Sequence, residues 1–202
     1  MEATAVRAPV LEMGDPLAEF LGALPPGGRF RYTYEDAVKL SGHSCPTVAG
    51  AYLMTVAALR ELYGDVLPQR GEIEVVLGGL SGDGTTGPTA QVIMLLTGAA
   101  PETGFGGMMG RWRRKGLLTF DPALQGKVRF RRTDTGAVVE AVCRLDRVPP
   151  APEMAALLAA SLSGRASTEE RLRFAGLWQS RVKELLSGDL SQVIEIRTLG
   201  RG

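Results

Sequence analysis

Apolar residues recur every three or four positions in the segment between Pro46 and Tyr63. The repeating positions are Val48, Tyr52, Val56, Leu59 and Tyr63, joined by Ala49 and Leu53. This spacing predicts a long helix with a wide apolar face that packs against the core of the domain. Pro46 suits the first turn because its missing N–H would have no partner there, and Gly64 ends the helix.

Start and stop signals predict further helices on both sides of this one. Residues 33–36 and 167–170 each have the spacing of a capping box, and Asp15-Pro16 opens another helix. The expected helices span residues 17–24, 34–41, 88–96, 153–162 and 168–187.

Strands are expected where β-branched and other apolar residues run between turn signals. The expected segments are 72–77, a strand pair around 108–120, a hairpin formed by 128–132 and 137–145, and a final strand at 192–198. Helices and strands are mixed without a regular βα repeat. The sequence therefore predicts an α+β fold, with a mixed or antiparallel sheet packed with helices, plus C-terminal helices.

The chain divides into three parts along its 202 residues. Residues 1–15 show no periodicity and are expected to form an N-terminal arm. Residues 16–148 are expected to form the α+β domain, which is long enough to bury a core. Residues 149–202 follow a proline-rich turn and are expected to form a C-terminal helical extension whose final strand packs on the same domain.

Composition narrows the class of protein. Apolar residues make up 45% of the chain and the formal net charge is +1, so no global field attracts nucleic acid or an anionic membrane. The basic cluster at 111–115 is interpreted as a solvated loop. No apolar run is long enough to span a membrane, and we see no signal peptide. With two cysteines in different contexts, reduced thiols and a cytoplasmic location are expected, with no nucleic acid and no membrane as partners.

Candidate chemistry gathers at one place, because His43 is the single histidine and Cys45 follows it by two positions. If the loop bends, imidazole and thiol converge, and both are preferred ligands of zinc, copper and iron. Pro46 makes Cys45 the N-cap of the long helix. The unpaired N–H groups and the positive end of the helix dipole favour the thiolate there. We therefore interpret this pair as a metal or cofactor site.

The motif at residues 42–46, Gly-His-Ser-Cys-Pro leading into a helix, resembles the opening motif of the FmdE family, which is named after a component of formylmethanofuran dehydrogenase. Residues 95–98 resemble the family's Leu-Thr-Gly at the end of its second helix. Residues 104–120 resemble its glycine-rich turn and the strand that follows. The resemblance covers about residues 15–148.

This resemblance implies that His43 and Cys45 bind a metal, generally zinc, and that the protein forms a homodimer. The family's further cysteine and aspartate before Leu-Thr-Gly are missing, since residues 85–91 contain neither. Two protein ligands are too few for a closed structural zinc site, which takes four. Other residues would contribute, an exogenous ligand would complete an open site, or the metal would sit inside a larger cofactor such as haem.

A haem pocket would need apolar walls. The expected cofactor-binding residues are Tyr52, Met108 and Met109, with Met54, Phe105 and Trp112 as further wall candidates. The methionines of the 108–109 pair are alternatively soft ligands for copper or ordinary core residues. Zinc is the first expectation, with haem iron and copper as alternatives.

The glycine-rich segment 78–87 superficially suggests phosphate binding, but it lacks the Gly-Lys-Ser/Thr of a P-loop. We expect this loop to lie opposite the His43 loop instead. Asp83 would then be a metal ligand, or would act with Thr86 or Gln91 as a hydrogen-bond partner of the ligands.

The leading hypothesis is a metal- or metallocofactor-binding protein with a binding, sensing or accessory role. The alternative is an enzyme that uses an open metal site, or the Cys45 thiolate with His43 as its base, for hydrolytic or redox chemistry. With no second histidine, such an enzyme would recruit Asp83, Glu102 or a tyrosine for proton transfer.

Overall fold

Seven α-helices and two sheets make up residues 8–201, the part of the chain that the computed structural model describes. The helices are α1 (Pro16–Phe20), α2 (Tyr34–Ser41), α3 (Pro46–Tyr63), α4 (Thr86–Thr97), α5 (Met154–Leu162), α6 (Thr168–Ser187) and α7 (Leu190–Val193). The strands are β1 (Leu11–Met13), β2 (Phe30–Tyr32), β3 (Ile73–Gly78), β4 (Leu118–Asp121), β5 (Val128–Arg132), β6 (Ala137–Cys143) and β7 (Ile194–Arg201).

The larger sheet has five strands in the order β4-β3-β5-β6-β7. Strands β3 and β4 are parallel, and the other neighbouring pairs are antiparallel. The register places Phe130 between Val75 and Val139, so apolar side chains line up across one face. The other face pairs charges, as in the 2.8 Å ion pair between Arg131 and Glu74. The predicted α+β fold with a mixed sheet is confirmed.

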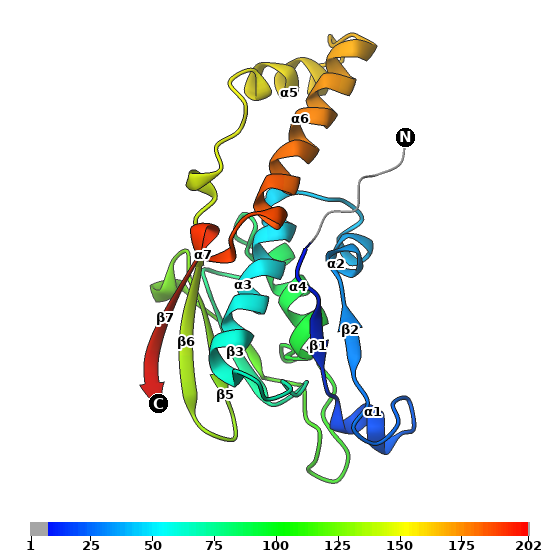
Figure 1. Ribbon diagram of the computed structural model, residues 1–202, viewed down its shortest axis with the longest axis vertical. Helices are drawn as coiled ribbons and strands as arrows, with labels where there is room; N and C mark the ends of the chain where they lie inside the picture. The colour runs from blue at the N-terminus through cyan, green and yellow to red at the C-terminus, as the bar shows by residue number, and fades with distance from the viewer. Residues whose placement is uncertain (1–7, 202) are drawn as a thin grey trace.

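Helix α3 is the centre of the core. Fifteen of its eighteen residues are buried, so it is apolar all round rather than on one face. Figure 1 shows α3 between the five-stranded sheet and the β1–β2 pair. Small residues allow this close packing, since a Cβ added to Gly50 would lie only 2.9 Å from Cys143 Sγ in β6. The buried Thr55 satisfies its hydroxyl by donating to the Ala51 carbonyl at 2.8 Å.

The small sheet formed by β1 and β2 is absent from the sequence-based prediction. The two strands are antiparallel and three residues long, too short to show a clear alternation of apolar and polar positions. Tyr52 of α3 ties them to the core, donating its hydroxyl to the carbonyls of Pro9 and Tyr32 at 2.6 and 2.9 Å. Part of the expected N-terminal arm is therefore a strand, while residues 1–7 lie outside the described residues.

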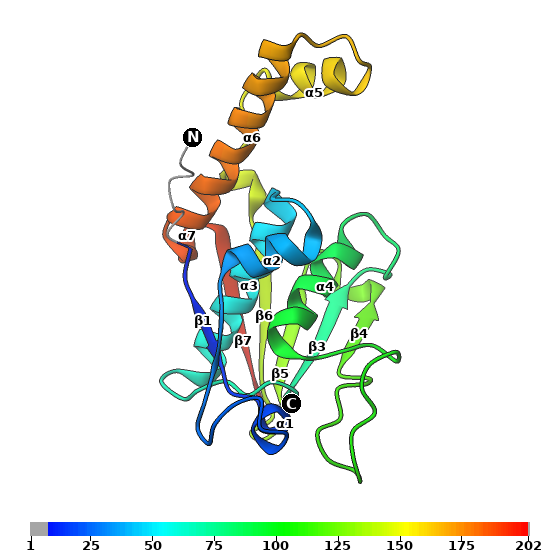
Figure 2. The same ribbon diagram turned by 90° about the vertical axis from the view of Figure 1, so that its right-hand side faces the viewer.

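Residues 98–117 form a long loop, so the strand pair expected around 108–120 is wrong. The only strand there, β4, begins at residue 118. The loop folds back on itself through backbone hydrogen bonds, with the Phe105 carbonyl accepting two N–H groups of the returning half at 2.9 Å. Figures 1 and 2 show this green segment beside α1, at the end of the molecule opposite α5 and α6.

A buried carboxylate fixes this loop to the domain. Asp15 caps α1 by accepting the N–H groups of Leu17 and Ala18, both at 3.1 Å. The same carboxylate pairs with Arg114 of the loop at 2.7 Å and with Arg70 at 3.1 Å. Asp15 and Arg114 are almost fully buried, and burial lowers the pKa of the Arg114 guanidinium.

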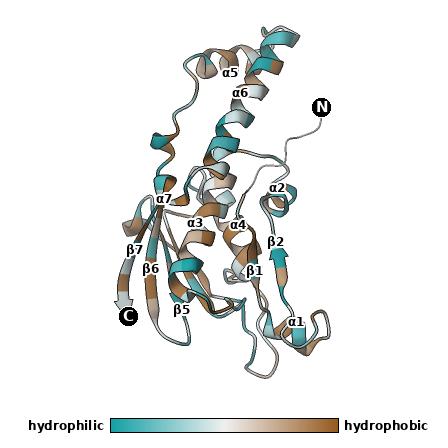
Figure 3. Cartoon of the chain, in the orientation of Figure 1, coloured by the Kyte–Doolittle hydropathy of each residue, from teal (hydrophilic) through white to brown (hydrophobic). Residues whose placement is uncertain are grey.

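Helices α5 and α6 form a hairpin that projects from the domain (Figures 1 and 2). The end of α6 nearer the domain packs into the core through Val182, Leu185 and Leu186. In contrast, Leu162 at the far end is 80% exposed. Figure 3 shows many hydrophilic, teal positions along α6, whereas α3 is largely brown. No helix within residues 8–201 has both the length and the apolar character needed to cross a membrane.

Replacing Asp15 with Asn should lower the free energy of unfolding by about 3 kcal/mol, because the buried guanidinium of Arg114 and the partly buried one of Arg70 lose their counter-charge. Urea denaturation of the whole chain measures this difference. The matched control is Glu74→Gln, which breaks a half-exposed ion pair and should cost about 0.5 kcal/mol. Equal losses in the two variants would contradict the central role of Asp15.

Candidate functional site

The predicted motif lies in the short loop between α2 and α3. Helix α2 ends at Gly42, whose positive φ of 72° turns the chain sharply, as the sequence predicts. Cys45 is the N-cap of α3, in extended backbone conformation, and its Sγ accepts the Val48 N–H at 3.4 Å. The cysteine is buried at the edge of the core. The prediction that Cys45 caps the long helix is therefore confirmed.

His43 points to solvent on the same loop. Its Nδ1 lies 2.8 Å from the Ser41 carbonyl oxygen. Because a carbonyl only accepts, Nδ1 carries the proton in this contact and the neutral ring keeps a free lone pair on Nε2. The exposed imidazole can therefore take a ligand from outside, whereas the Cys45 thiol is enclosed.

Three side chains hold Ser44, the residue between them. Trp178 and Gln179 of α6 donate to the Ser44 carbonyl at 3.0 and 3.2 Å. The Tyr34 hydroxyl of α2 lies 3.0 Å from the Ser44 hydroxyl. The C-terminal extension thus holds the motif loop in place through hydrogen bonds. The sequence does not predict this contact, because no local pattern links residues so far apart in the chain.

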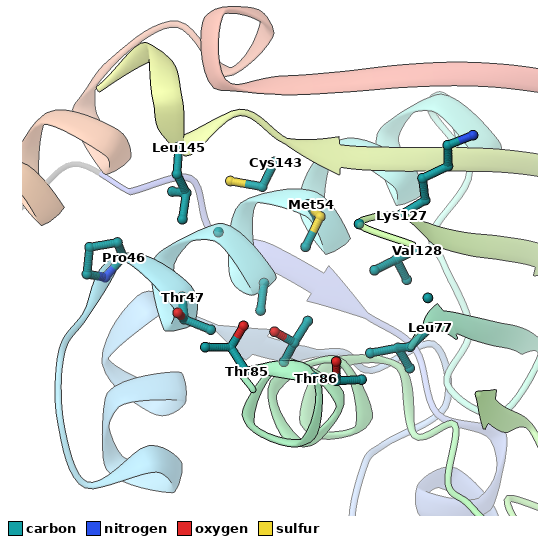
Figure 4. A pocket seen from close by; sticks show the side chains of 15 residues that line it. Pro46, Thr47, Met54, Leu77, Thr85, Thr86, Lys127, Val128, Cys143 and Leu145 are labelled. Atoms are coloured by element: carbon teal, nitrogen blue, oxygen red, sulfur yellow. The ribbon is translucent and has the colours of Figure 1, made fainter. Parts of the chain in front are cut away.

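A cavity of about 170 Å³ opens beside the motif, at the start of α3. Its walls come from α3, the end of β3, the start of α4, the beginning of β5 and the end of β6. Figure 4 shows Thr47, Thr85 and Thr86 along one side of the cavity, with Met54, Cys143 and Leu145 opposite. One wall therefore offers hydroxyl groups and the other offers sulfur and aliphatic carbon.

The ionisable groups on the cavity wall are Lys127 and Cys143. Lys127 directs its ammonium away from the cavity (Figure 4), and Nζ lies 3.5 Å from Glu140 Oε2. Burial raises the pKa of the Cys143 thiol to about 11, so this sulfur is protonated at neutral pH. The thiol is therefore not poised to exchange a proton with a bound molecule near pH 7, and the ammonium group is turned away from such a molecule.

The structure brings together only some of the residues singled out from the sequence. The glycine-rich loop before α4 does lie across from the motif, since Thr86 and Pro46 line the same cavity. Met54 is also on the wall. Asp83 is exposed and accepts the N–H of Leu80 at 3.1 Å. Within residues 8–201 no three His, Cys, Asp or Glu side chains form a cluster suited to a metal ion.

Other expected cofactor residues lie elsewhere. Tyr52 is fully buried and donates its hydroxyl to the carbonyls of Pro9, just before β1, and of Tyr32 in β2. Met108 and Met109 belong to the 98–117 loop, which packs against α1 at the far end of the domain (Figure 2). The structure does not bring these two methionines to His43. Cys143, the other cysteine, is partly buried against the core and lines the cavity.

Known proteins resemble this chain in part of the fold and at low sequence identity. No protein-family model matches the sequence, and no curated protein matches it. Among solved structures, the chain is similar to a tungsten formylmethanofuran dehydrogenase FmdE-like protein from Syntrophus aciditrophicus. The TM-score is 0.44 and the identity 18%, over 85% of this chain and 74% of that chain. A likeness at this level assigns neither a site nor an activity.

Alkylation of Cys143 should be slow and strongly dependent on pH. In a Cys45→Ser variant, the rate at pH 8 should be on the order of 100-fold lower in the native chain than in urea, since the pKa rises from 9.0 to about 11. Iodoacetamide labelling followed by mass spectrometry measures both rates. Equal native and unfolded rates would show that the thiol is not shielded.

The Cys143 thiol also makes the free energy of unfolding depend on pH. Above pH 9 the unfolded chain loses the thiol proton while the folded chain retains it. The stabilisation that this thiol gives the folded state is therefore complete below pH 9 and is lost as the pH rises towards 11. A Cys143→Ser variant removes this contribution and serves as the control. Its unfolding free energy should fall less steeply over that interval than that of the wild type.

Proposed function

We propose that this chain is a small-molecule-binding protein whose ligand occupies the cavity between the first turns of α3 and α4. The observation that carries this proposal is the two-sided wall, with threonine hydroxyls facing sulfur and aliphatic side chains. Concave sites with a mainly apolar lining and a few convergent polar groups are the usual form of ligand sites. The cavity also adjoins Pro46, so the ligand would lie next to the conspicuous motif of the sequence.

The chemistry of the walls limits the ligand. A volume of 170 Å³ is below the roughly 300–1,000 Å³ of sites for drug-sized molecules, so the ligand is smaller than a nucleotide or a haem. The hydroxyls of Thr47, Thr85 and Thr86 suit a polar end that donates and accepts hydrogen bonds. The side that carries Met54 and Leu145 suits a compact apolar or sulfur-containing body.

The wall favours binding over catalysis. Its cysteine is protonated at neutral pH and its lysine is directed to Glu140. General acid–base catalysis needs a group that titrates near the working pH and reaches the reacting atom. The binding, sensing or accessory role therefore has more support from the geometry than the enzymatic alternative.

Replacing Thr89 with Leu should weaken ligand binding at least tenfold, because the added methyl groups project from α4 into the cavity. Ligand-observed NMR with a library of small hydroxy, keto and thioether compounds measures binding to the wild-type chain and the variant. The stability should change by less than about 1 kcal/mol, since Thr89 is half-buried at the cavity wall.

The control for this experiment is Thr119→Leu, an exposed position in β4 that does not line the cavity. It should bind the same compounds with unchanged affinity. The proposal fails if no compound binds the wild type, or if Thr89→Leu retains full binding.

We propose as a second function that His43 and Cys45 hold a metal ion in an open site. The supporting observation is that an imidazole with a free Nε2 and a cysteine at the N-terminus of α3 lie two positions apart on one short loop, in a motif resembling that of the FmdE family. The described residues do not fit a closed zinc site, because a third protein ligand is missing. The remaining positions would be filled by an exogenous ligand or by a second copy in the expected homodimer. If bound, zinc would act as a Lewis acid towards such a ligand.

Zinc binding should depend on both residues of the pair. After incubation with Zn²⁺ and gel filtration, elemental mass spectrometry should find about one zinc per chain in the wild type, and little in His43→Ala or Cys45→Ser. Cys143→Ser, which removes the other thiol, should retain the metal. The same zinc content in all four proteins would rule this site out, and would leave the cavity proposal untouched.

A further inference from the structure

A second exposed surface lies at the opposite end of the molecule, where α1 meets the 98–117 loop. We call it the loop-end patch; it comprises Phe20, Leu21, Phe105, Met109, Arg111 and Arg113. The four apolar members are exposed by 60%, 62%, 44% and 102%. Trp112 joins the two segments, with its ring centroid 4.4 Å from that of Phe20. Large apolar side chains gathered in this way usually mark an interaction site.

The backbone of this patch is strained. Met108 and Arg111 exchange two backbone hydrogen bonds of 2.9 Å, which leaves Met109 and Gly110 at the tip of a tight turn. Met109 has a φ of 47° and Trp112 a φ of 57°, and within residues 8–201 these are the non-glycine residues with positive φ. Such conformations cost energy in bulky residues and tend to persist where function requires them. Here the strain presents a methionine side chain fully to solvent.

The patch also carries unbalanced positive charge. Lys115 pairs with Glu102 at 3.1 Å. Arg111 lies over the Trp112 ring, 4.5 Å from its centroid, and Arg113 donates its Nε–H to the Lys115 carbonyl at 2.7 Å. In the described part of the chain neither arginine has a carboxylate partner. Two cations therefore flank an apolar tip.

We propose that the loop-end patch docks on the surface of an anionic phospholipid membrane, with Met109, Phe20 and Leu21 among the acyl chains and Arg111 and Arg113 on the phosphates. Interfacial segments combine apolar and basic residues in this way. Figures 1 and 2 show α1 and the loop at one extreme of the long axis, so a flat surface can approach without meeting the rest of the domain. The net charge of +1 concealed this feature, because it averages over the whole chain.

The form of the patch favours a membrane over a macromolecular partner. Its tip is a tight turn at one end of the molecule, so a protein partner would need a matching cleft, whereas lipid deforms around it. A single-stranded nucleic acid would stack its bases on exposed aromatic faces. The Trp112 ring lies against Phe20 and Arg111, 4.4 and 4.5 Å from its centroid, so this largest aromatic ring of the loop offers little stacking surface.

Vesicle sedimentation of the full chain tests this inference, with phosphatidylcholine vesicles that contain or lack phosphatidylserine. The wild type should bind the phosphatidylserine vesicles and show little binding to the others. Met109→Ser should weaken binding on the order of tenfold. Arg111→Gln combined with Arg113→Gln should weaken it ~30-fold, about a factor of five for each charge. These side chains are exposed, so thermal unfolding should be nearly unchanged.

The control is Leu162→Ser, which removes another highly exposed apolar side chain at the end of α5, opposite the loop-end patch. This variant should bind the vesicles as the wild type does. The inference fails if phosphatidylserine vesicles do not bind, or if Leu162→Ser weakens binding as much as Met109→Ser. It also fails if a single-stranded oligonucleotide binds to the wild type and the vesicles do not.

Discussion

The burial of α3 is the constraint on which the remaining structure depends. An apolar helix of eighteen residues must be covered on every side, and the chain covers it with the five-stranded sheet, the β1–β2 pair, α4 and the end of α6. Its first turn is fixed by Cys45 and Pro46, where the motif loop meets the cavity. The candidate site therefore takes its position from the packing of the core, and any ligand there contacts the helix at the centre of that core.

Local signals in the sequence predicted the elements well. The helices at 34–41 and 168–187 begin and end where their capping residues and glycines indicate, and α3 starts at its proline. Capping and proline effects act within one helical turn, so they can be recognised from neighbouring residues in the sequence. Two other features depend on residues far apart in the sequence, so no local pattern predicts them. They are the β1–β2 pair and the hydrogen bond from Trp178 to the Ser44 carbonyl.

Part of the candidate site was predictable and part was not, for a topological reason. Strand β3 ends at the cavity and α4 begins there, which is why the glycine-rich loop faces the motif as expected. Strand β4 is parallel to β3, so the chain must return to the opposite end before β4 starts. Helix α4 makes that return, and Met108 and Met109 lie in the loop that follows it, at the end away from Cys45. The sequence showed their chemistry, but the direction of β4 decided where they lie.

The contact between Ser44 and α6 has a consequence for how the chain folds. The two residues that meet, Ser44 and Trp178, are 134 positions apart, and closing so long a segment costs conformational entropy before any contact offsets it. Helices α2 and α3 can form early from local interactions, whereas the loop between them acquires its final hydrogen bonds only when α6 docks. During synthesis on the ribosome, α2 and α3 would therefore form before the hydrogen bonds from α6 that complete the loop between them. A chain still being made would hold the motif loop without the hydrogen bonds that Trp178 and Gln179 donate to Ser44.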